Sequence, residues 1–227
     1  MLQDIYIQYR GACMMLFQKD GAELLSFRGT AFLAHPDGYL ITAAHLITGN
    51  MELMVAPLTE ADDFAPVRTE TVAPYHVDVI LLDQDRDLAL LKFRGEIELT
   101  VPDHIIGKPD QVPIGNSVAC LGFPFGYYNI YNPLIKQAVI SSKILSANET
   151  RIFLFDSLVH DGNRGSPLIN LYDGRIIGVV GGRFELQEIL ERYFGKTSEI
   201  PIKTDVSYAV SIEHAVELME KENLTVI

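Results

Sequence analysis

Three short segments of the sequence carry residue types that could do nucleophilic chemistry. His45 ends the segment TAAH after an apolar stretch, and Asp87 opens the apolar run DLALLK. Further along, the glycine-rich segment DGNRGSPL holds Arg164 between Asn163 and Gly165. A histidine base, a carboxylate that orients it and a nucleophile in a tight turn together activate a hydroxyl for acyl transfer. Each segment alone is typical of ordinary structure, but all three in this order indicate a catalytic arrangement.

The stretches around these segments predict short β-strands. Residues 29–34 and 39–42 flank the turn HPDG, which predicts a hairpin that leads to His45. Other apolar or β-branched runs, bounded by Gly, Pro, Asn and Asp, occur at residues 51–57, 77–82, 88–93, 117–121, 138–144, 152–155, 175–180 and 208–210. So many short strands favour a barrel or sandwich over alternating strand–helix units.

Two segments follow a helical pattern instead. Residues 184–194 and 211–224 space their apolar side chains three or four positions apart, which predicts two amphipathic helices. Ser211 begins the second segment and is expected to cap its helix. The stretch 102–115 is rich in Pro, Gly and Asp, and we expect it to cross between two halves of the chain.

Composition limits the classes of protein and partner that fit. The chain has 227 residues, 48% of them hydrophobic, which is enough for a substantial core in a single domain. No apolar run reaches the roughly 18 residues that a membrane helix needs. The net charge of −12 is spread along the chain and repels nucleic acid and anionic lipid. We therefore expect neutral or basic partners, with no nucleic acid and no membrane among them.

The cysteines and histidines indicate whether the chain holds disulfides or a metal, and the first residues indicate its location. Cys13 and Cys120 are too few for a disulfide framework and are expected to be buried free thiols, with a single bridge as the alternative. The histidines other than His45 lack the spacing of metal ligands, so we expect no metal and no cofactor. The start of the sequence lacks a basic region before an apolar stretch, which predicts no secretory signal and a cytoplasmic location.

The three segments and two others resemble the trypsin-like (chymotrypsin-fold) serine proteases, most of all the HtrA/Deg-type protease domain. The similar stretches run from about residue 28 to residue 219 and are GTAFLAHPDGYLITAAHLI, DQDRDLALLKF, LGFPFG, FDSLVHDGNRGSPLIN and YAVSIEHAVELM. In this family the base, the carboxylate and the nucleophile follow one another as His, Asp and Ser. The PDZ domain that often follows such a protease domain is not expected, because the sequence ends first.

The resemblance implies the fold. We expect an all-β chain of two antiparallel Greek-key β-barrels, about six strands each, with a cleft between them and a C-terminal α-helix. The whole chain, 1–227, is then one protease domain. Its N-terminal barrel covers about residues 1–107, its C-terminal barrel about 108–210 and its helix 211–224.

The resemblance also implies roles for individual residues. His45 takes the place of the general base, and Asp87 that of the carboxylate that orients it. The oxyanion hole falls at Gly162 and Asn163, with the backbone N–H groups of positions 162 and 164 as its donors. The family motif Gly-Asn-Ser-Gly-x-Pro has its nucleophilic serine where this chain has Arg164.

An arginine at that position removes the attacking atom. Its guanidinium stays protonated and only donates hydrogen bonds, so it cannot attack a carbonyl, and losing the nucleophile costs on the order of a millionfold in turnover. Ser166 is not expected to replace it, because it would lie in the outgoing strand. We expect Arg164 to fold across the vacated site, where it pairs with Asp87, Asp156 or Asp161 or fills the substrate pocket.

The resemblance places the specificity pocket at Leu158, with Gly181 and Gly182 on its wall. Such a pocket would take aliphatic or aromatic side chains; the alternative is that Leu158 only packs in the core. Residues 183–204 form a longer connection than expected between the last two strands. An inert surface insertion is the favoured interpretation of this connection, and a lid or partner-binding surface is the alternative.

Two functions follow from these expectations. In the first, the chain is a pseudoprotease that binds polypeptide or unfolded-protein segments without cleaving them. In the second, it is an active serine endopeptidase, either because its native residue 164 is serine and this copy is altered, or because another hydroxyl attacks. HtrA-type relatives often form trimers, so a homo-oligomer is a possible state of this chain.

Overall fold

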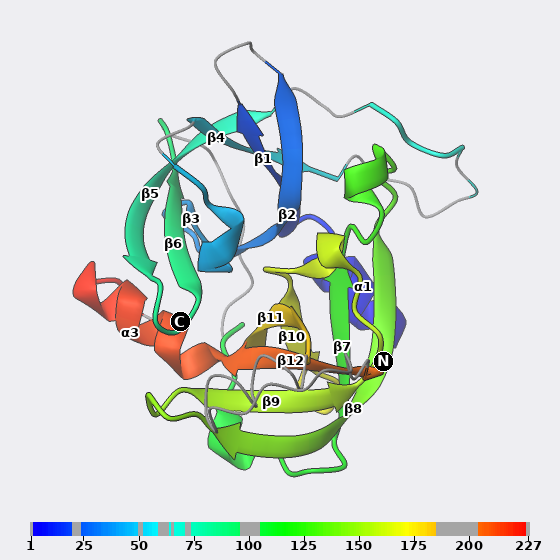
Figure 1. Cartoon of the computed structure of the whole chain (residues 1–227), viewed down its shortest axis with the longest axis vertical. Helices are drawn as coiled ribbons and strands as arrows, with labels where there is room; N and C mark the ends of the chain where they lie inside the picture. The colour runs from blue at the N-terminus through cyan, green and yellow to red at the C-terminus, as the bar shows by residue number, and fades with distance from the viewer. Residues whose placement is uncertain are drawn as a thin grey trace, which may run out of the picture.

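The structure, a computed structural model, consists of two closed β-barrels with one helix at each end of the chain (Figure 1). It describes residues 2–19, 24–49, 52–58, 64, 66–70, 74–95, 105–184 and 204–225. Its helices and strands are α1 (Leu2–Tyr9), β1 (Cys13–Lys19), β2 (Leu25–His35), β3 (Tyr39–Thr42), β4 (Glu52–Pro57), β5 (Tyr75–Asp83), β6 (Leu88–Phe93), β7 (Ser117–Gly122), β8 (Leu134–Leu145), β9 (Arg151–Asp156), β10 (Pro167–Asn170), β11 (Ile176–Arg183), β12 (Val206–Ser211) and α3 (Ile212–Lys221). The described residues also include four short 3-10 turns: η1 (Ala44–Leu46), η2 (Pro109–Gln111), η3 (Gly126–Tyr128) and η4 (Asp161–Asn163).

Each barrel is a closed ring of six antiparallel strands. The order is β1-β2-β3-β6-β5-β4 in the first barrel and β10-β11-β12-β9-β8-β7 in the second. Every neighbouring pair runs antiparallel. Closure removes the free strand edges that an open sheet would expose. The predicted two-barrel, all-β class is therefore confirmed.

The first two elements of the chain, α1 and β1, are ones that the sequence does not predict. The segment CMMLFQK of β1 shows no alternation because both of its faces are buried. Met14 and Leu16 point into the first barrel, whereas Met15 and Phe17 pack on the outside with Phe27. A short run that is apolar on both faces has no period that distinguishes a strand from a buried helix.

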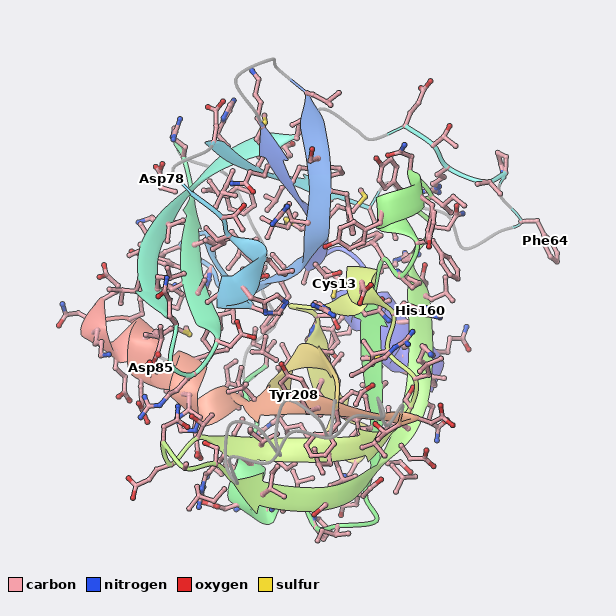
Figure 2. All side chains as sticks on the ribbon, in the orientation of Figure 1. Cys13, Phe64, Asp78, Asp85, His160 and Tyr208 are labelled. Carbon is pink, nitrogen blue, oxygen red and sulfur yellow. The ribbon has the colours of Figure 1, made fainter. Side chains whose placement is uncertain are left out.

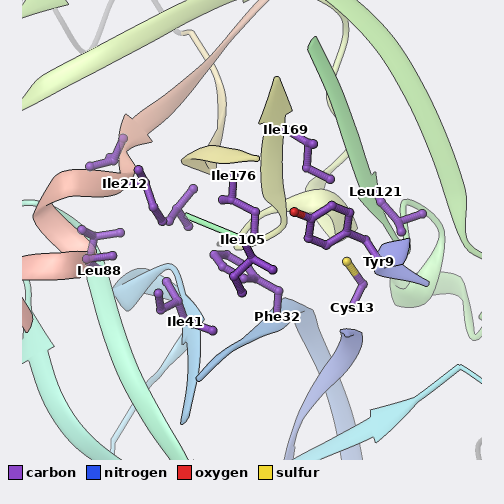
Figure 3. Packing of buried hydrophobic residues seen from close by; sticks show 14 of the residues in the cluster. Tyr9, Cys13, Phe32, Ile41, Leu88, Ile105, Leu121, Ile169, Ile176 and Ile212 are labelled. Carbon is purple, nitrogen blue, oxygen red and sulfur yellow. The ribbon is translucent and has the colours of Figure 1, made fainter. Parts of the chain in front are cut away.

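The two barrels meet over a shared hydrophobic cluster, which explains why several strands are apolar on both faces. Phe32 and Ile41 from the first barrel pack there with Leu121 and Ile169 from the second (Figure 3). Helix α1 joins this cluster through Tyr9, whose hydroxyl donates a 2.6 Å hydrogen bond to the carbonyl of Gly174. This buried cluster fixes the position of one barrel against the other. The candidate site lies where turns from the two barrels meet.

The C-terminal helix α3 packs against β6 of the first barrel and β11 of the second. Its predicted position, 211–224, agrees with the observed Ile212–Lys221 to within three residues at the C-terminal end. The expected cap is wrong, however. Ser211 occupies the N-cap position, but its hydroxyl makes no capping hydrogen bond and is buried without a partner among the described residues.

Helix α3 also carries a buried histidine that predicts a pH dependence of stability. The Nε2 atom of His214 accepts the backbone N–H of Arg151 at 3.0 Å, so protonation there would break a bond to β9. Burial lowers the pKa of His214 below 6.5, and Arg86 adds to this, against the opposing effect of Glu213 and Glu217. The unfolded chain therefore binds a proton at higher pH than the folded chain does. This part of the stability is present above about pH 6.5 and is lost as pH falls through the lowered pKa.

Urea unfolding of the native chain and of His214→Gln, above and below about pH 6.5, measures the effect. The native chain is expected to lose more unfolding free energy on acidification than the variant does, because glutamine does not titrate. Equal losses in the two proteins would assign the acid sensitivity to other groups and contradict the prediction.

Two predictions fall outside the described residues. Of the predicted helix 184–194, only Phe184 is described, and of the expected lid or insertion 183–204, only its two ends are. Both stay predictions. The crossover at 102–115 is described from Ile105 onward, where Gly107 donates its N–H to the carbonyl of Ile176 at 2.8 Å and η2 follows.

Candidate active site

His45 and Asp87 lie side by side at the edge of the first barrel. His45 lies in η1, directly after β3, and Asp87 lies in the turn that leads into β6. The Nδ1 atom of the imidazole lies 2.7 Å from Oδ2 and 2.9 Å from Oδ1 of Asp87. The two side chains are 34% and 24% exposed, so a bound molecule could reach them. An imidazole held at Nδ1 by a carboxylate can take up a proton at Nε2.

Backbone contacts fix the position of this pair. The N–H of His45 donates to Oδ1 of Asp87 at 2.8 Å, and the N–H of Ala44 donates to the Asp87 carbonyl at 3.2 Å. Strands β3 and β6 pair with Thr42 opposite Ala89, which brings the two turns to the same edge. Asp87 itself has a φ of 59°, a left-handed conformation that costs energy for a residue with a side chain.

The glycine-rich turn around Arg164 reaches the first barrel at the same edge. The Arg164 carbonyl accepts the N–H of Thr30 at 2.9 Å, and the Thr30 hydroxyl donates to the Gly162 carbonyl at 2.8 Å. A methyl group added at Gly165 would lie only 3.1 Å from Cδ1 of Leu46, the residue after His45. The structure thus brings together all three segments that the sequence singles out.

The Arg164 side chain pairs with a carboxylate of its own turn. Its Nη2 atom lies 2.9 Å from Oδ1 of Asp161, which is therefore the partner among the three candidate aspartates. The Arg164 side chain runs along Gly182, where an added methyl group would lie 3.3 Å from Nε. This Nε is buried and has no hydrogen-bond partner among the described residues. The arginine therefore lies against the expected pocket wall and is 35% exposed.

One of the two expected oxyanion-hole donors, the N–H of position 164, is engaged within the turn itself. It donates to the Asp161 carbonyl at 3.1 Å, and the neighbouring N–H of Asn163 donates to the His160 carbonyl at 2.9 Å. An oxyanion needs N–H groups that converge on one point and are free to donate to it. In this arrangement, position 164 offers no free donor, because the Asp161 carbonyl occupies it.

Ser166 lies on the inner side of the turn. It is fully buried, and its hydroxyl has no partner among the described residues. Its Cβ lies 3.3 Å from where a methyl group on Gly122 of β7 would be, and that point is also 3.0 Å from Thr30 Oγ1, so Ser166 lies close to where β7 meets the first barrel. Over the described part of the chain, the imidazole of His45 is bonded to Asp87 and to no hydroxyl.

The residues expected to form the specificity pocket have neighbours that the sequence did not suggest. Leu158 is half-buried, and its carbonyl accepts a hydrogen bond from the Lys136 ammonium. The ring of Tyr208 covers Gly181, since a methyl group added there would lie 2.2 Å from its Cε2. Tyr208 pairs with Gly182 across β11 and β12 and is labelled in Figure 2. A pair of glycines opposite an aromatic residue is the sequence signal that could have identified this contact.

An aromatic group beside the turn is a second feature that the sequence pattern did not single out. Tyr127 donates its hydroxyl to the Arg28 carbonyl at 2.5 Å, and its ring meets Phe27 edge-on at 5.2 Å. Burial raises the pKa of Tyr127, and the charges of Arg28 and Arg164 oppose this rise. The run FPFGYY after β7, rich in aromatic residues, is the signal that could have predicted it.

His160 is the other histidine near the site. Its ring lies 5.3 Å from the Phe125 ring, beside η4 (Figure 2). Burial lowers the pKa of His160, with further lowering by Lys136 and Arg183.

Among the described residues, no group of three or more His, Cys, Asp or Glu side chains could hold a metal ion. None of the described helices is long and apolar enough to cross a membrane.

Several known proteins are similar to this chain. A family model for the trypsin-like peptidase domain matches residues 29–179. The magnetosome formation protease MamE of Magnetospirillum gryphiswaldense is 27% identical over 156 residues, which are 66% of this chain and 18% of that protein. The probable periplasmic serine endoprotease DegP-like of Chlamydia pneumoniae is 30% identical over 161 residues, which are 67% of this chain and 28% of that protein.

A solved structure supports the same fold. The HtrA-type protease AlgW with a tripeptide superposes with a TM-score of 0.70 at 20% identity, over 97% of this chain and 63% of that one. Serine protease HTR4 of Rattus norvegicus is 28% identical over 160 residues, 69% of this chain and 30% of that protein. This chain therefore spans less than a third of the length of these curated relatives.

The comparisons correct the expected location. The cytoplasmic location expected from the sequence is contradicted, because one relative is named as periplasmic and another as a magnetosome protein. The expectation rested on the first residues of the sequence. In a sequence that spans only part of its relatives, those residues carry no information about the compartment.

Proposed function

Because the chain belongs to the trypsin-like peptidase family, we propose that it is a pseudoprotease of the HtrA/Deg type, which binds polypeptide segments in its cleft without cleaving them. The observation that carries the proposal is the residue at the nucleophile position. Arg164 has no hydroxyl, and its guanidinium is held by Asp161 at 2.9 Å. Without an attacking oxygen, the family reaction cannot form its acyl-enzyme.

The rest of the site keeps a form that suits binding. In the proposed roles, His45 stands as the base and Asp87 orients it, while Gly162 and Asn163 belong to the turn of the oxyanion hole. The Arg164 side chain lies along Gly182, and the Tyr208 ring lies over Gly181. These two side chains therefore occupy the wall of the pocket in which Leu158 was expected to receive a substrate side chain. A bound segment would then lie over these side chains rather than insert between them.

The expected ligands are neutral or basic polypeptides in an unfolded state. The net charge of −12 favours such ligands over acidic ones. The similar AlgW structure holds a tripeptide, which supports peptide as the ligand class for this fold. A homo-oligomer also belongs to the proposal, since HtrA-type relatives often form trimers.

An active endopeptidase is the second candidate, and one observation favours it. The His45–Asp87 pair has the geometry of a working base, with 2.7 Å between Nδ1 and Oδ2. The buried position of Ser166 argues against that residue as the attacking group. The second candidate therefore requires a hydroxyl from outside the described residues, or a serine as the native residue at position 164.

A fluorophosphonate probe and a binding measurement distinguish the two candidates. We expect no covalent labelling of the native chain, because labelling needs an activated serine. We also expect saturable binding of fluorescein-labelled lysozyme that has been reduced and carboxamidomethylated, an unfolded basic polypeptide, followed by fluorescence anisotropy without any loss of that polypeptide on a gel. Labelling that disappears in His45→Ala would establish the endopeptidase instead. Absence of both labelling and binding of the unfolded lysozyme would refute peptide binding.

A further inference from the structure

A cavity of about 300 Å³ opens at the end of the second barrel, and none of the candidate catalytic residues lines it. Its walls come from η2, from the ends of β8 and β9 and from the last residue of β12. Lining residues that matter for its chemistry are Pro109, Asp110, Lys143, Arg151, Phe153 and Ser211. Barrel mouths of about this volume are frequent positions for small-molecule sites.

The hydroxyl of Ser211 is a polar group in this wall that lacks a partner. Ser211 is 1% exposed, and its Oγ bonds to no described residue. It stands two residues after Ala209, which packs with Phe153 in the core of the second barrel, so Ser211 lies on the same inward face. A buried hydroxyl without a partner costs free energy comparable to a lost hydrogen bond. A ligand that accepts its hydrogen bond would remove that cost.

Ser211 is also the N-cap residue of α3, where it does not bond the helix. The first N–H groups of a helix have no partner within the helix, and they carry a partial positive charge. In most helices a serine at this position would satisfy one of them with its own oxygen. Here the helix terminus and the unbonded hydroxyl together favour an acceptor with negative charge.

Two cations flank the same cavity. The Nζ atom of Lys143 donates to the Pro109 carbonyl at 3.0 Å, and no carboxylate pairs with it among the described residues. Arg151 is paired with Asp110 at 2.8 Å and with Glu213 at 2.9 Å. Asp110 is 75% exposed, so it can turn away into solvent and leave part of the guanidinium to a ligand. The cavity thus offers donors from three side chains.

The remaining wall of the cavity is apolar. The Phe153 ring lies below Lys143, with 5.5 Å between Nζ and the ring centroid, and it is 2% exposed. Ile144, Leu145 and Ile152 complete this part of the wall. Within this wall Leu145 is 65% exposed, so a purely inorganic anion would leave its side chain in contact with water. An anion with a short apolar group would cover it.

From this arrangement, we propose that the mouth of the second barrel binds a monocarboxylate that carries a branched aliphatic group. Its carboxylate accepts hydrogen bonds from Ser211 Oγ, Lys143 Nζ and Arg151, and its aliphatic group packs on Leu145, in the same wall as Phe153. The same chemistry occurs in a free branched-chain acid and in the C-terminal residue of a peptide that ends in leucine. The site is separate from the cleft of the proposed function and does not depend on it.

Titrations of the isotopically labelled full chain, followed by NMR, test the proposal with two acids. The probes are 3-methylbutanoate and N-acetyl-L-leucine, and their controls are the uncharged 3-methylbutanamide and N-acetyl-L-leucinamide. We expect saturable shifts of the Phe153 and Ser211 amide signals with both acids, and affinities about tenfold weaker for both amides, because the amides lack the charge. Tighter binding of N-acetyl-L-leucine would identify a peptide C-terminus as the ligand source, and tighter binding of the free acid would identify a metabolite.

The affinities of matched variants show which side chains contribute to binding. Lys143→Met keeps the aliphatic stem and is expected to weaken the binding of both acids about tenfold. Ser211→Ala is expected to weaken it by at least about tenfold, since it removes one hydrogen bond to a charged group. Lys92→Met is the control, because Lys92 also lies over an aromatic ring, at 4.4 Å from that of Tyr39, but outside the cavity.

The proposal is overturned if neither acid gives saturable shifts at Phe153 and Ser211. It is also overturned if the amides bind as tightly as the acids, or if Lys92→Met weakens binding as much as Lys143→Met does. Lys143 is an exposed residue on β8, so its variant is expected to fold even if the buried Ser211 does not tolerate substitution.

Discussion

Replacing Arg164 with serine is expected to give a chain that a fluorophosphonate probe labels covalently, whereas the native chain stays unlabelled. The proposed base and the carboxylate proposed to orient it already lie together, with His45 Nδ1 2.7 Å from Asp87 Oδ2. The change supplies the one missing atom, the hydroxyl that this base could deprotonate. Because losing that atom costs up to about a millionfold in turnover, we expect a gain in labelling rate of at least roughly a thousandfold.

The same substitution also acts on the oxyanion hole. In the native chain, the Arg164 N–H is bonded to the Asp161 carbonyl, and the side chains of the same two residues are paired. Serine removes that ion pair and so loosens the turn. We therefore expect labelling slower than that of an active protease, because the peptide unit between Asp161 and Gly162 must still rotate to free the donor.

Two variants control this experiment. Arg164→Ala removes the guanidinium without adding a hydroxyl and is expected to stay unlabelled. The double variant Arg164→Ser with His45→Ala keeps the hydroxyl but has no base, and it is expected to lose the labelling again. If Arg164→Ser folds with a native melting temperature yet stays unlabelled, the remaining groups do not form a competent site, and the proposed roles of His45 and Asp87 fail.

Gly165→Ala is expected to destabilise the fold by more than about 4 kcal/mol, which is exceptional for a single methyl group. Gly165 has a φ of 82°, a conformation that costs a residue with a side chain about 1–2 kcal/mol. The methyl group would also lie 2.1 Å from the Thr30 carbonyl oxygen and 2.3 Å from Thr42 Oγ1. It would therefore break the 2.7 Å hydrogen bond from Thr42 to Thr30 in the buried contact between the barrels.

Gly115→Ala separates the cost of the backbone conformation from the cost of the steric clash. Gly115 has a similar φ of 89°, but a methyl group there would meet nothing within 4 Å. This control is expected to lose only about 1–2 kcal/mol. In thermal unfolding, the Gly165 variant should melt about 8–16 °C below the native chain. Equal losses for the two variants would show that the turn around Arg164 relaxes freely and is not held tightly between the barrels.

The resemblance of five segments to the trypsin-like proteases predicted the two-barrel fold and the outline of the site. Apolar or β-branched runs bounded by Gly, Pro, Asn and Asp predicted ten of the described strands. The segments around His45, Asp87 and Arg164 carried enough residue-specific information to predict that they meet. Strand β1 was missed because the interior of the first barrel buries one of its faces and the cluster around Phe27 buries the other. Helix α1 was missed because it has only eight residues, of which Ile5 and Tyr9 are buried.

The sequence by itself determined which chemical groups this protein has, above all that position 164 carries a permanently charged guanidinium and no hydroxyl. Only the tertiary structure decided which partners these groups have. It paired Arg164 with Asp161, closed the turn of the oxyanion hole through the Asp161 carbonyl, covered Gly181 with Tyr208 and turned Ser211 away from its helix into a cavity. The physical reason is that covalent chemistry is fixed residue by residue. Hydrogen bonds and packing depend instead on which segments, far apart in the chain, are brought within a few ångströms of one another.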